Sequence, residues 1–188
     1  MKRLAVYCGS NMGSAPHFAE RARVLGETMA VRGVDLVYGG GHRGLMGVVA
    51  DAVLAGGGKA YGVIPRALVE LEVAHRGLTE LHVVETMHER KALMTELTDA
   101  FVAIPGGVGT LDELFEAWSW NALGYHSKPF ALLNEDGFWD SMLAFLDTTV
   151  SSGFVSQGRR DQLLVAASPD ETIDLLTAAA GGKAGMVW

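Results

Sequence analysis

The chain has 188 residues, of which 49% are hydrophobic and 20% are charged. No apolar run approaches the ~20 residues that a membrane-spanning helix needs, and the N-terminal MKRLAVYCGS enters a strand pattern rather than a secretory signal, so we expect a cytoplasmic protein that contacts no membrane. The 15 basic and 22 acidic side chains give a net charge of −7, which argues against nonspecific binding of nucleic acid.

Short apolar stretches alternate with helical patterns along the whole chain. Strands are predicted at residues 4–8, 35–39, 60–64, 81–85, 100–104, 130–133 and 163–166. Helices are predicted at residues 16–32, 43–56, 86–98, 110–123, 138–152 and 169–180. This alternation is typical of βαβ units, so we predict an α/β fold with a doubly wound parallel sheet of about seven strands. We expect one domain over residues 1–180 and a frayed, Gly-rich tail over 181–188.

The first predicted strand ends at Cys8, the single cysteine of the chain. One cysteine excludes an intrachain disulfide and any multi-cysteine metal site. Its position beside Gly9 favours a small buried thiol over a nucleophile. The six histidines show no metal-ligand spacing, so we predict neither a metal site nor a cofactor.

Three glycine clusters each follow a predicted strand and precede a predicted helix: CGSNMG at 8–13, GGGHRGLMG at 39–47 and PGGVGT at 105–110. That location is the carboxyl edge of the sheet, where glycine lets the backbone approach a ligand and a helix start offers N–H groups to a phosphate. Any one cluster is most simply a tight turn, but three on one edge favour a nucleotide-like ligand. The first two clusters supply as candidate contacts Gly9, Ser10, Gly40 and Gly41.

The predicted helix at 86–98 begins with TMHERKALMTEL, in which Thr86 and Glu89 have the spacing of a capping box. Arg90 falls in the middle of an otherwise apolar stripe of this helix. It either snorkels out of the core or points into the cleft, and the need of the glycine loops for a cation favours the cleft. Lys91, at the edge of the stripe, is either a second phosphate contact or a solvated lysine.

The predicted helix at 110–123 repeats the capping-box spacing with Thr110 and Glu113, so a purely structural role for this glutamate is a serious alternative. One face of the helix is apolar, but Trp120 and Leu123 lie among the acids of the opposite face. We therefore expect a second subunit to cover that face. Glu72 lies in the polar stretch VELEVAHRGLTEL, where a loop carboxylate is usually solvated.

The motifs VYGGGHRGLMG, MHERKALM and PGGVGTLDE are together similar to the LOG (Lonely Guy) family of cytokinin riboside 5'-monophosphate phosphoribohydrolases. The hallmark of that family is PGGxGTxxE together with an Arg-Lys pair. The likeness extends from the first predicted strand to about residue 165. Members are often labelled lysine decarboxylases, but no lysine of this chain is placed as an anchor for pyridoxal.

The resemblance implies a Rossmann-like homodimer, with sites near the subunit interface, that cleaves the N-glycosidic bond of a nucleoside 5'-monophosphate to a free base and ribose 5-phosphate. By position in the motifs, Arg90 and Glu113 match the catalytic pair. The positions that match substrate contacts are Glu72, Lys91, Gly106, Gly107, Val108, Gly109 and Thr110. We add Asp112, in a variable slot of the motif, as a candidate contact.

Two questions stay open at the level of sequence. The base could be adenine or an N6-modified adenine, because several loops, and a second chain, contribute to a base pocket. The same fold also supports a carrier or sensor that holds a phosphorylated ligand without cleaving it. The presence of both Arg90 and Glu113 favours the enzyme.

Overall fold

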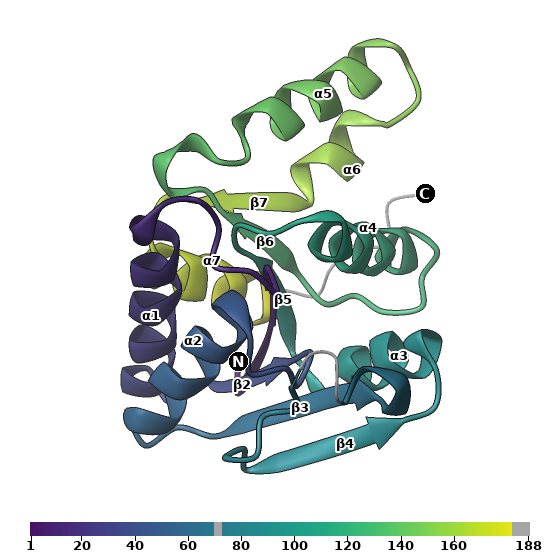
Figure 1. The fold of residues 1–188 in the computed structure, drawn as a ribbon. Helices are drawn as coiled ribbons and strands as arrows, with labels where there is room; N and C mark the ends of the chain where they lie inside the picture. Colours follow the sequence, from purple (N-terminus) through teal and green to yellow (C-terminus); the bar gives the residue numbers. More distant parts are fainter. Residues whose placement is uncertain (70–72, 182–188) are drawn as a thin grey trace.

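The computed structural model describes residues 1–69 and 73–181, and its centre is a sheet of seven parallel strands (Figure 1). The strand order is β4-β3-β2-β1-β5-β6-β7. The strands are β1 (Arg3–Tyr7), β2 (Asp35–Tyr38), β3 (Ala60–Pro65), β4 (Glu80–Val84), β5 (Ala100–Ala103), β6 (Phe130–Leu133) and β7 (Leu163–Ala166). The predicted doubly wound sheet is therefore confirmed, and each strand lies within about one residue of its predicted range.

The helices are α1 (Pro16–Val31), α2 (Gly44–Ala55), α3 (Met87–Leu97), α4 (Val108–Ala122), α5 (Asp140–Ser151), α6 (Gln157–Asp161) and α7 (Pro169–Gly181). Two short 3₁₀ turns, η1 (Arg66–Leu68) and η2 (Glu135–Gly137), follow β3 and β6. All six predicted helices are present. Helix α6 was not predicted, because it is too short for a periodic pattern, and α4 begins at Val108 rather than at the predicted residue 110.

Alternate residues of the central strands serve the two faces of the sheet. In β1, Leu4 and Val6 pack into a core beneath α1, α2 and α7, whereas Ala5 and Tyr7 pack into a core beneath α3 and α4. All four of these side chains are buried. Burial on both faces explains why the strands are continuous apolar runs rather than alternating ones.

The strand order changes direction between β1 and β5. These two strands pair directly, so the loops that leave their carboxyl ends lie side by side. The Gly9 N–H donates to the Pro105 carbonyl at 3.1 Å, which joins the first and third glycine clusters. This switch point is the position at which open α/β sheets bind their ligands.

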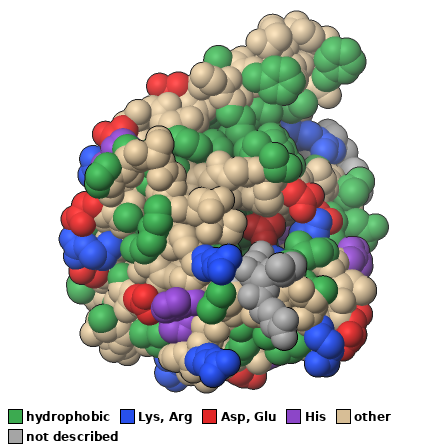
Figure 2. Space-filling view, viewed as in Figure 1, with side chains coloured by type: hydrophobic (Ala, Val, Ile, Leu, Met, Phe, Trp, Pro, Cys, Tyr) green, Lys and Arg blue, Asp and Glu red, His purple; other side chains and the backbone are tan. Residues whose placement is uncertain are grey.

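Helices α5 and α6 form an arm beyond β7, at one end of the sheet (Figure 1). Hydrophobic side chains gather along this arm in the space-filling view (Figure 2). Phe145 is 64% exposed and Phe154 is 86% exposed. Among residues 1–69 and 73–181, no helix has the length and apolar character that crossing a bilayer requires. Except for Gly181, which ends α7, the predicted tail lies outside the described residues.

Candidate functional site

A cavity of about 500 Å³ opens at the switch point between β1 and β5. Its walls come from the loops after these two strands, from the first turns of α3 and α4, and from Phe138 before α5. The predicted site residues that line it are Gly9, Ser10, Arg90, Gly106, Gly107, Val108, Gly109, Thr110, Asp112 and Glu113. Residues from four separate elements therefore meet where the sequence analysis placed the site.

Some of the glycines serve the packing of one loop on another. A Cβ built on Gly106 would lie 2.0 Å from the Thr110 hydroxyl and 2.9 Å from the Gly9 nitrogen. Gly44 has a φ of +63°, and a Cβ there would lie 2.3 Å from the Ser10 carbonyl carbon. A structural role is thus sufficient for Gly106 and Gly44, because a side chain at Gly106 would clash with Thr110 and one at Gly44 would clash with the backbone at Ser10.

Gly107 and Gly109 are different, because a Cβ on either would meet no described heavy atom within 4 Å. Gly107 is the N-cap of α4 and has no side chain with which to cap the helix. The first N–H groups of a helix have no partner within the helix, and they carry the positive end of its dipole. The start of α4 therefore presents uncapped amides to the cavity, with room in front of them.

The capping box predicted from Thr110 and Glu113 is wrong. Because α4 already begins at Val108, Thr110 lies inside the first turn, 3% exposed and packed against Gly106. No described residue is a hydrogen-bond partner of the Thr110 hydroxyl. Glu113 is half-buried and lines the cavity. The structure thus removes the capping alternative for this carboxylate.

The capping box predicted at the start of α3 is confirmed. The Thr86 hydroxyl accepts the Glu89 N–H at 3.1 Å, and the Glu89 carboxylate accepts the Thr86 N–H at 3.4 Å. This cap fixes the first turn of α3, from which Arg90 projects.

Arg90 is 4% exposed and lines the cavity, so its side chain does not snorkel into bulk solvent. One guanidinium nitrogen, Nη2, donates to the Gly39 carbonyl at 3.0 Å. A Cβ on Gly39 would lie 1.9 Å from that nitrogen. The first glycine after β2 is therefore required to admit the guanidinium.

The charges of Glu113 and Arg90 act at the end of β1, where Tyr7 and Cys8 lie. Burial raises the pKa of the Cys8 thiol, the Glu113 carboxylate raises it further, and Arg90 opposes the rise. Burial and Glu113 also raise the pKa of Tyr7. Cys8 is therefore a protonated, buried thiol, as predicted, and an unsuitable nucleophile.

Three of the predicted site residues that the structure describes do not line the cavity. Lys91 is 15% exposed and pairs with Asp112 at 3.1 Å and Glu116 at 3.0 Å, so it is neither solvated nor directed at the cavity. Burial lowers its pKa, but the bonds to these two carboxylates outweigh that effect and leave the pKa raised. Gly40 and Gly41 turn toward the chain around residue 74. Glu72 lies outside the described residues.

The apolar part of the cavity wall was not predicted from the sequence. These side chains come from six segments and show no common spacing. They are Met12, Phe18, Leu45, Met46, Leu68, Met87 and Phe138. Only the packing of the fold brings them together, so no local pattern could have identified them.

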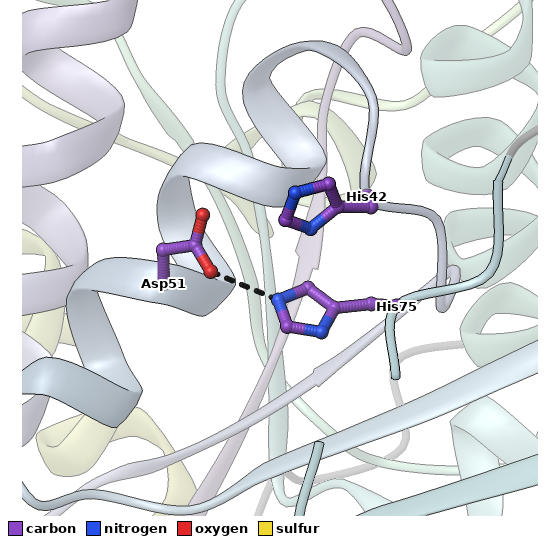
Figure 3. Close-up of side chains that lie close together, drawn as sticks. All are labelled: His42, Asp51 and His75. Atoms are coloured by element: carbon purple, nitrogen blue, oxygen red, sulfur yellow. Dashed lines mark hydrogen bonds and ion pairs between the residues drawn. The ribbon is translucent and has the colours of Figure 1, made fainter. Parts of the chain in front are cut away.

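A second cluster was also missed, outside this cavity. His42, Asp51 and His75 offer ligand atoms that all lie within 4.8 Å of one another (Figure 3). They come from the loop after β2, from α2 and from the loop before β4. Their spacing in the sequence resembles no metal motif, which is why the pattern gave no signal.

Comparison with known proteins supplies independent information about the chain. Residues 46–176 match the family model described as "Possible lysine decarboxylase". The cytokinin riboside 5'-monophosphate phosphoribohydrolase LOG of Oryza sativa subsp. japonica is 46% identical over 172 residues, which are 92% of this chain and 71% of that protein. The phosphoribohydrolase LOG2 of Arabidopsis thaliana is 43% identical over 175 residues, covering 93% of this chain and 82% of that protein.

Solved structures with the same architecture are more distant in sequence. The molybdenum cofactor carrier protein of Chlamydomonas reinhardtii superposes with a TM-score of 0.71 at 20% identity, over 96% of this chain and 98% of that one. The molybdenum cofactor binding protein of Rippkaea orientalis gives a TM-score of 0.71 at 23% identity, over 94% and 95%. At these identities the likeness shows the fold alone.

Proposed function

The chain belongs to the LOG family of cytokinin riboside 5'-monophosphate phosphoribohydrolases, and from this premise we propose that it hydrolyses the N-glycosidic bond of adenosine 5'-monophosphates, N6-modified ones included. The products are the free base, adenine or a cytokinin, and ribose 5-phosphate. The observation that carries the proposal is that Glu113 and Arg90 line one cavity together with the uncapped start of α4.

The phosphate binds at the start of α4. Uncapped amides and a positive dipole end attract an anion, and the absence of side chains at Gly107 and Gly109 lets it approach the backbone. The buried Thr110 hydroxyl is a further donor in the same turn. Binding the phosphate, which does not react, supplies energy that holds the ribose in place.

Glu113 is the catalytic carboxylate. Cleavage of the ribosyl bond leaves positive charge on the anomeric carbon and the ring oxygen, and a carboxylate beside that carbon stabilises the charge. The same group orients the attacking water and accepts its proton. Glu113 is suited to this role because it lies one turn beyond the phosphate site on the same helix, at the wall of the cavity.

Arg90 positions the sugar phosphate. Its guanidinium is held by the Gly39 carbonyl and lies in the wall of the cavity, where it can bind the ribose or the phosphate. A positively charged group that fixes the substrate relative to Glu113 lowers the barrier by aligning water with the anomeric carbon. The base then lies against the apolar wall, which includes Met12, Phe18 and Phe138.

We also propose that the protein acts in the cytoplasm as a homodimer with its sites near the subunit interface. Large apolar side chains are exposed at the end of α4 and on the arm, including Leu123 at 70%, Tyr125 at 75% and Phe154 at 86%. A surface of this kind is covered in stable proteins by a partner. Phe138 connects the arm to the cavity, so a subunit that covers the arm would also border the site.

Two other functions are less well supported. The shared fold of molybdenum cofactor carriers would allow binding without cleavage, but a carrier has no use for a carboxylate beside the anomeric carbon. Decarboxylation of lysine would need an anchored cofactor, and no lysine is among the described residues that line the cavity.

The direct test is to incubate the protein with AMP and, separately, with isopentenyladenosine monophosphate, and to measure free base and ribose 5-phosphate by chromatography. The proposal predicts equal amounts of the two products. Adenosine and isopentenyladenosine, which have no phosphate, serve as matched controls and should be cleaved far more slowly. If the protein binds these monophosphates but releases no base from either, the carrier alternative replaces the proposal.

A further inference from the structure

The second cluster lies behind the wall of the cavity rather than in it. Asp51 projects from α2 toward the ring of His75, and the ring of His42 lies edge-on against His75 (Figure 3). The His75 Nε2 is 2.9 Å from an Asp51 carboxylate oxygen. The two rings have centroids 4.5 Å apart at an interplanar angle of 78°.

Two histidines and an aspartate are a ligand set that suits zinc, but the other nitrogen of His75 argues against a metal ion here. The Gly77 backbone N–H donates to the His75 Nδ1 at 3.0 Å. Since a backbone N–H can only donate, Nδ1 carries no proton and the proton of the neutral ring is on Nε2. A histidine that binds a metal through one nitrogen donates a proton from the other, which is the opposite arrangement.

The tautomer fixed by Gly77 instead directs the Nε2–H of His75 at Asp51. The charged acceptor strengthens this hydrogen bond, and His75 itself is only 6% exposed. The contact therefore attaches the loop before β4 to helix α2. His42 contributes packing through its ring and needs no charge for that purpose.

The attached loop in turn holds the glycine loop after β2. The His75 N–H donates to the Gly40 carbonyl at 2.9 Å, and the His42 N–H donates to the Val73 carbonyl at 2.9 Å. These bonds flank an antiparallel bridge between Gly41 and Ala74. The neighbouring carbonyl, that of Gly39, accepts a hydrogen bond from Arg90. Hydrogen bonds, linked by the backbone of His75 and of Gly39 and Gly40, thus connect Asp51 to the guanidinium.

We propose that Asp51 and His75 are positioning residues for Arg90, acting through the loop at 39–41. This inference rests on the proposed function for its effect on turnover. Loosening the clasp, defined as Asp51, His75 and His42, would let the Gly39 carbonyl shift and the guanidinium lose its orientation. Small displacements of a group that aligns the substrate are enough to slow the chemical step.

The first test compares Asp51→Ala with Asp51→Asn. The asparagine still offers an oxygen to the His75 Nε2–H, so it is the matched control. Asp51→Ala should lower kcat on AMP about tenfold with a small change in KM, and Asp51→Asn should restore most of the loss. In an Arg90→Lys background the same Asp51→Ala change should cost less than about twofold, because both substitutions act on one group. An equal loss in both backgrounds would overturn the inference.

The second test does not depend on catalysis. Amide hydrogen exchange at His42 and His75, whose N–H groups donate across the bridge, should speed up in Asp51→Ala but not in Asp51→Asn. Unchanged exchange would overturn the inference even if the protein proved to have another activity, whereas faster exchange in a protein without hydrolase activity would refute the proposed function alone.

The third test separates the clasp from a metal site. His42→Phe keeps the edge-on ring contact and removes two ligand nitrogens, so its kcat should equal that of the unsubstituted protein. Titration with Zn²⁺ alone should show no saturable binding. Saturable binding of Zn²⁺ that His42→Phe abolishes would overturn the inference and assign the cluster to a metal.

Discussion

The first turns of helices α3 and α4 contain the same sequence motif, a threonine followed three residues later by a glutamate. The motif has a different role in each helix. At the start of α3 the two side chains cap the helix. In α4 the glycines before the threonine allow the helix to start at Val108, so Thr110 is enclosed in the first turn and Glu113 is left for the cavity. A capping motif therefore marks a position at which a helix can begin. Whether the helix begins there depends on the conformation of the preceding loop.

The largest expected effect comes from the glutamate of α4. Glu113→Gln should reduce hydrolysis of AMP by about 10³-fold, because the amide can neither carry the negative charge nor accept a proton. The melting temperature should stay close to that of the unsubstituted protein, since the Glu113 side chain does not cap α4. Steady-state kinetics and thermal melting measure both effects. Glu89→Gln is the matched control, which keeps the cap of α3 and should keep full activity.

If Glu113→Gln remained active, the carboxylate would have no part in the chemistry. If it instead melted several degrees lower, as expected for a lost cap, then α3 and α4 would use their glutamates in the same way and the comparison would fail.

The second-largest effect is expected at Arg90, which lies in the capped first turn of α3 and lines the same cavity as the start of α4. Arg90→Ala should lower kcat/KM by about 100-fold while the chain still unfolds cooperatively. Kinetics and a denaturant titration measure the two properties. A variant with unaltered specific activity and a large loss of stability would assign Arg90 to the core instead.

In the glycine loop before α4, one glycine is expected to affect substrate binding and its neighbour to affect stability as well. Gly107→Ala meets no described atom within 4 Å and should leave the free energy of unfolding nearly unchanged. It should raise KM for AMP about tenfold, because the added methyl group lies where the phosphate approaches the amides. Gly106→Ala, which would clash with Thr110 and Gly9, should lower stability as well. Equal KM values for Gly107→Ala and the unsubstituted protein would place the phosphate elsewhere.

The cap of α3 gives a smaller effect, confined to stability. Thr86→Ala removes the hydroxyl that accepts the Glu89 N–H and should cost about 1 kcal/mol of unfolding free energy. Thr86→Ser should recover most of it. Urea denaturation measures the difference, and a neutral Thr86→Ala would mean that the cap contributes nothing in the folded chain.

The far end of α4 supplies the smallest effect. Burial and the nearby Lys128 lower the pKa of His126 to about 4, against the backbone bond to Ala117, so the folded state favours the neutral ring. The unfolded chain then binds the extra proton, and this contribution to stability, complete above pH 6.5, is lost as the pH falls toward 4. The melting temperature should fall as the pH is lowered from 6.5 to 5, and His126→Asn should make this fall smaller by about 2 °C. An identical pH profile would contradict the lowered pKa.

The sequence predicted the sheet, and most of the predicted site residues line one cavity, because both depend on local patterns. Apolar runs followed by glycine mark the carboxyl ends of strands, and parallel pairing brings those ends together wherever the strand order is switched. Arg90 could be assigned to the cleft because glycine loops that hold a phosphate need a cation beside them.

The remaining features depend on contacts between distant segments. Lys91 is held by two carboxylates on a different helix, and His75 meets Asp51 only because a loop crosses back over α2. Helix α4 begins earlier than predicted because of the packing of the preceding loop, and the periodicity of apolar residues in a helix contains no information about that packing. In each of these cases the partner lies far away in the chain, and one sequence contains no record of the pairing.

Gly39 shows how a position can be constrained without meeting a ligand. Its missing side chain is the space that the Arg90 guanidinium occupies. In a saturation library selected for turnover, replacements at this position should be depleted, because even the methyl group of an alanine must displace the guanidinium from its place beside the Gly39 carbonyl. A survey that ranked positions by distance from the substrate would overlook it.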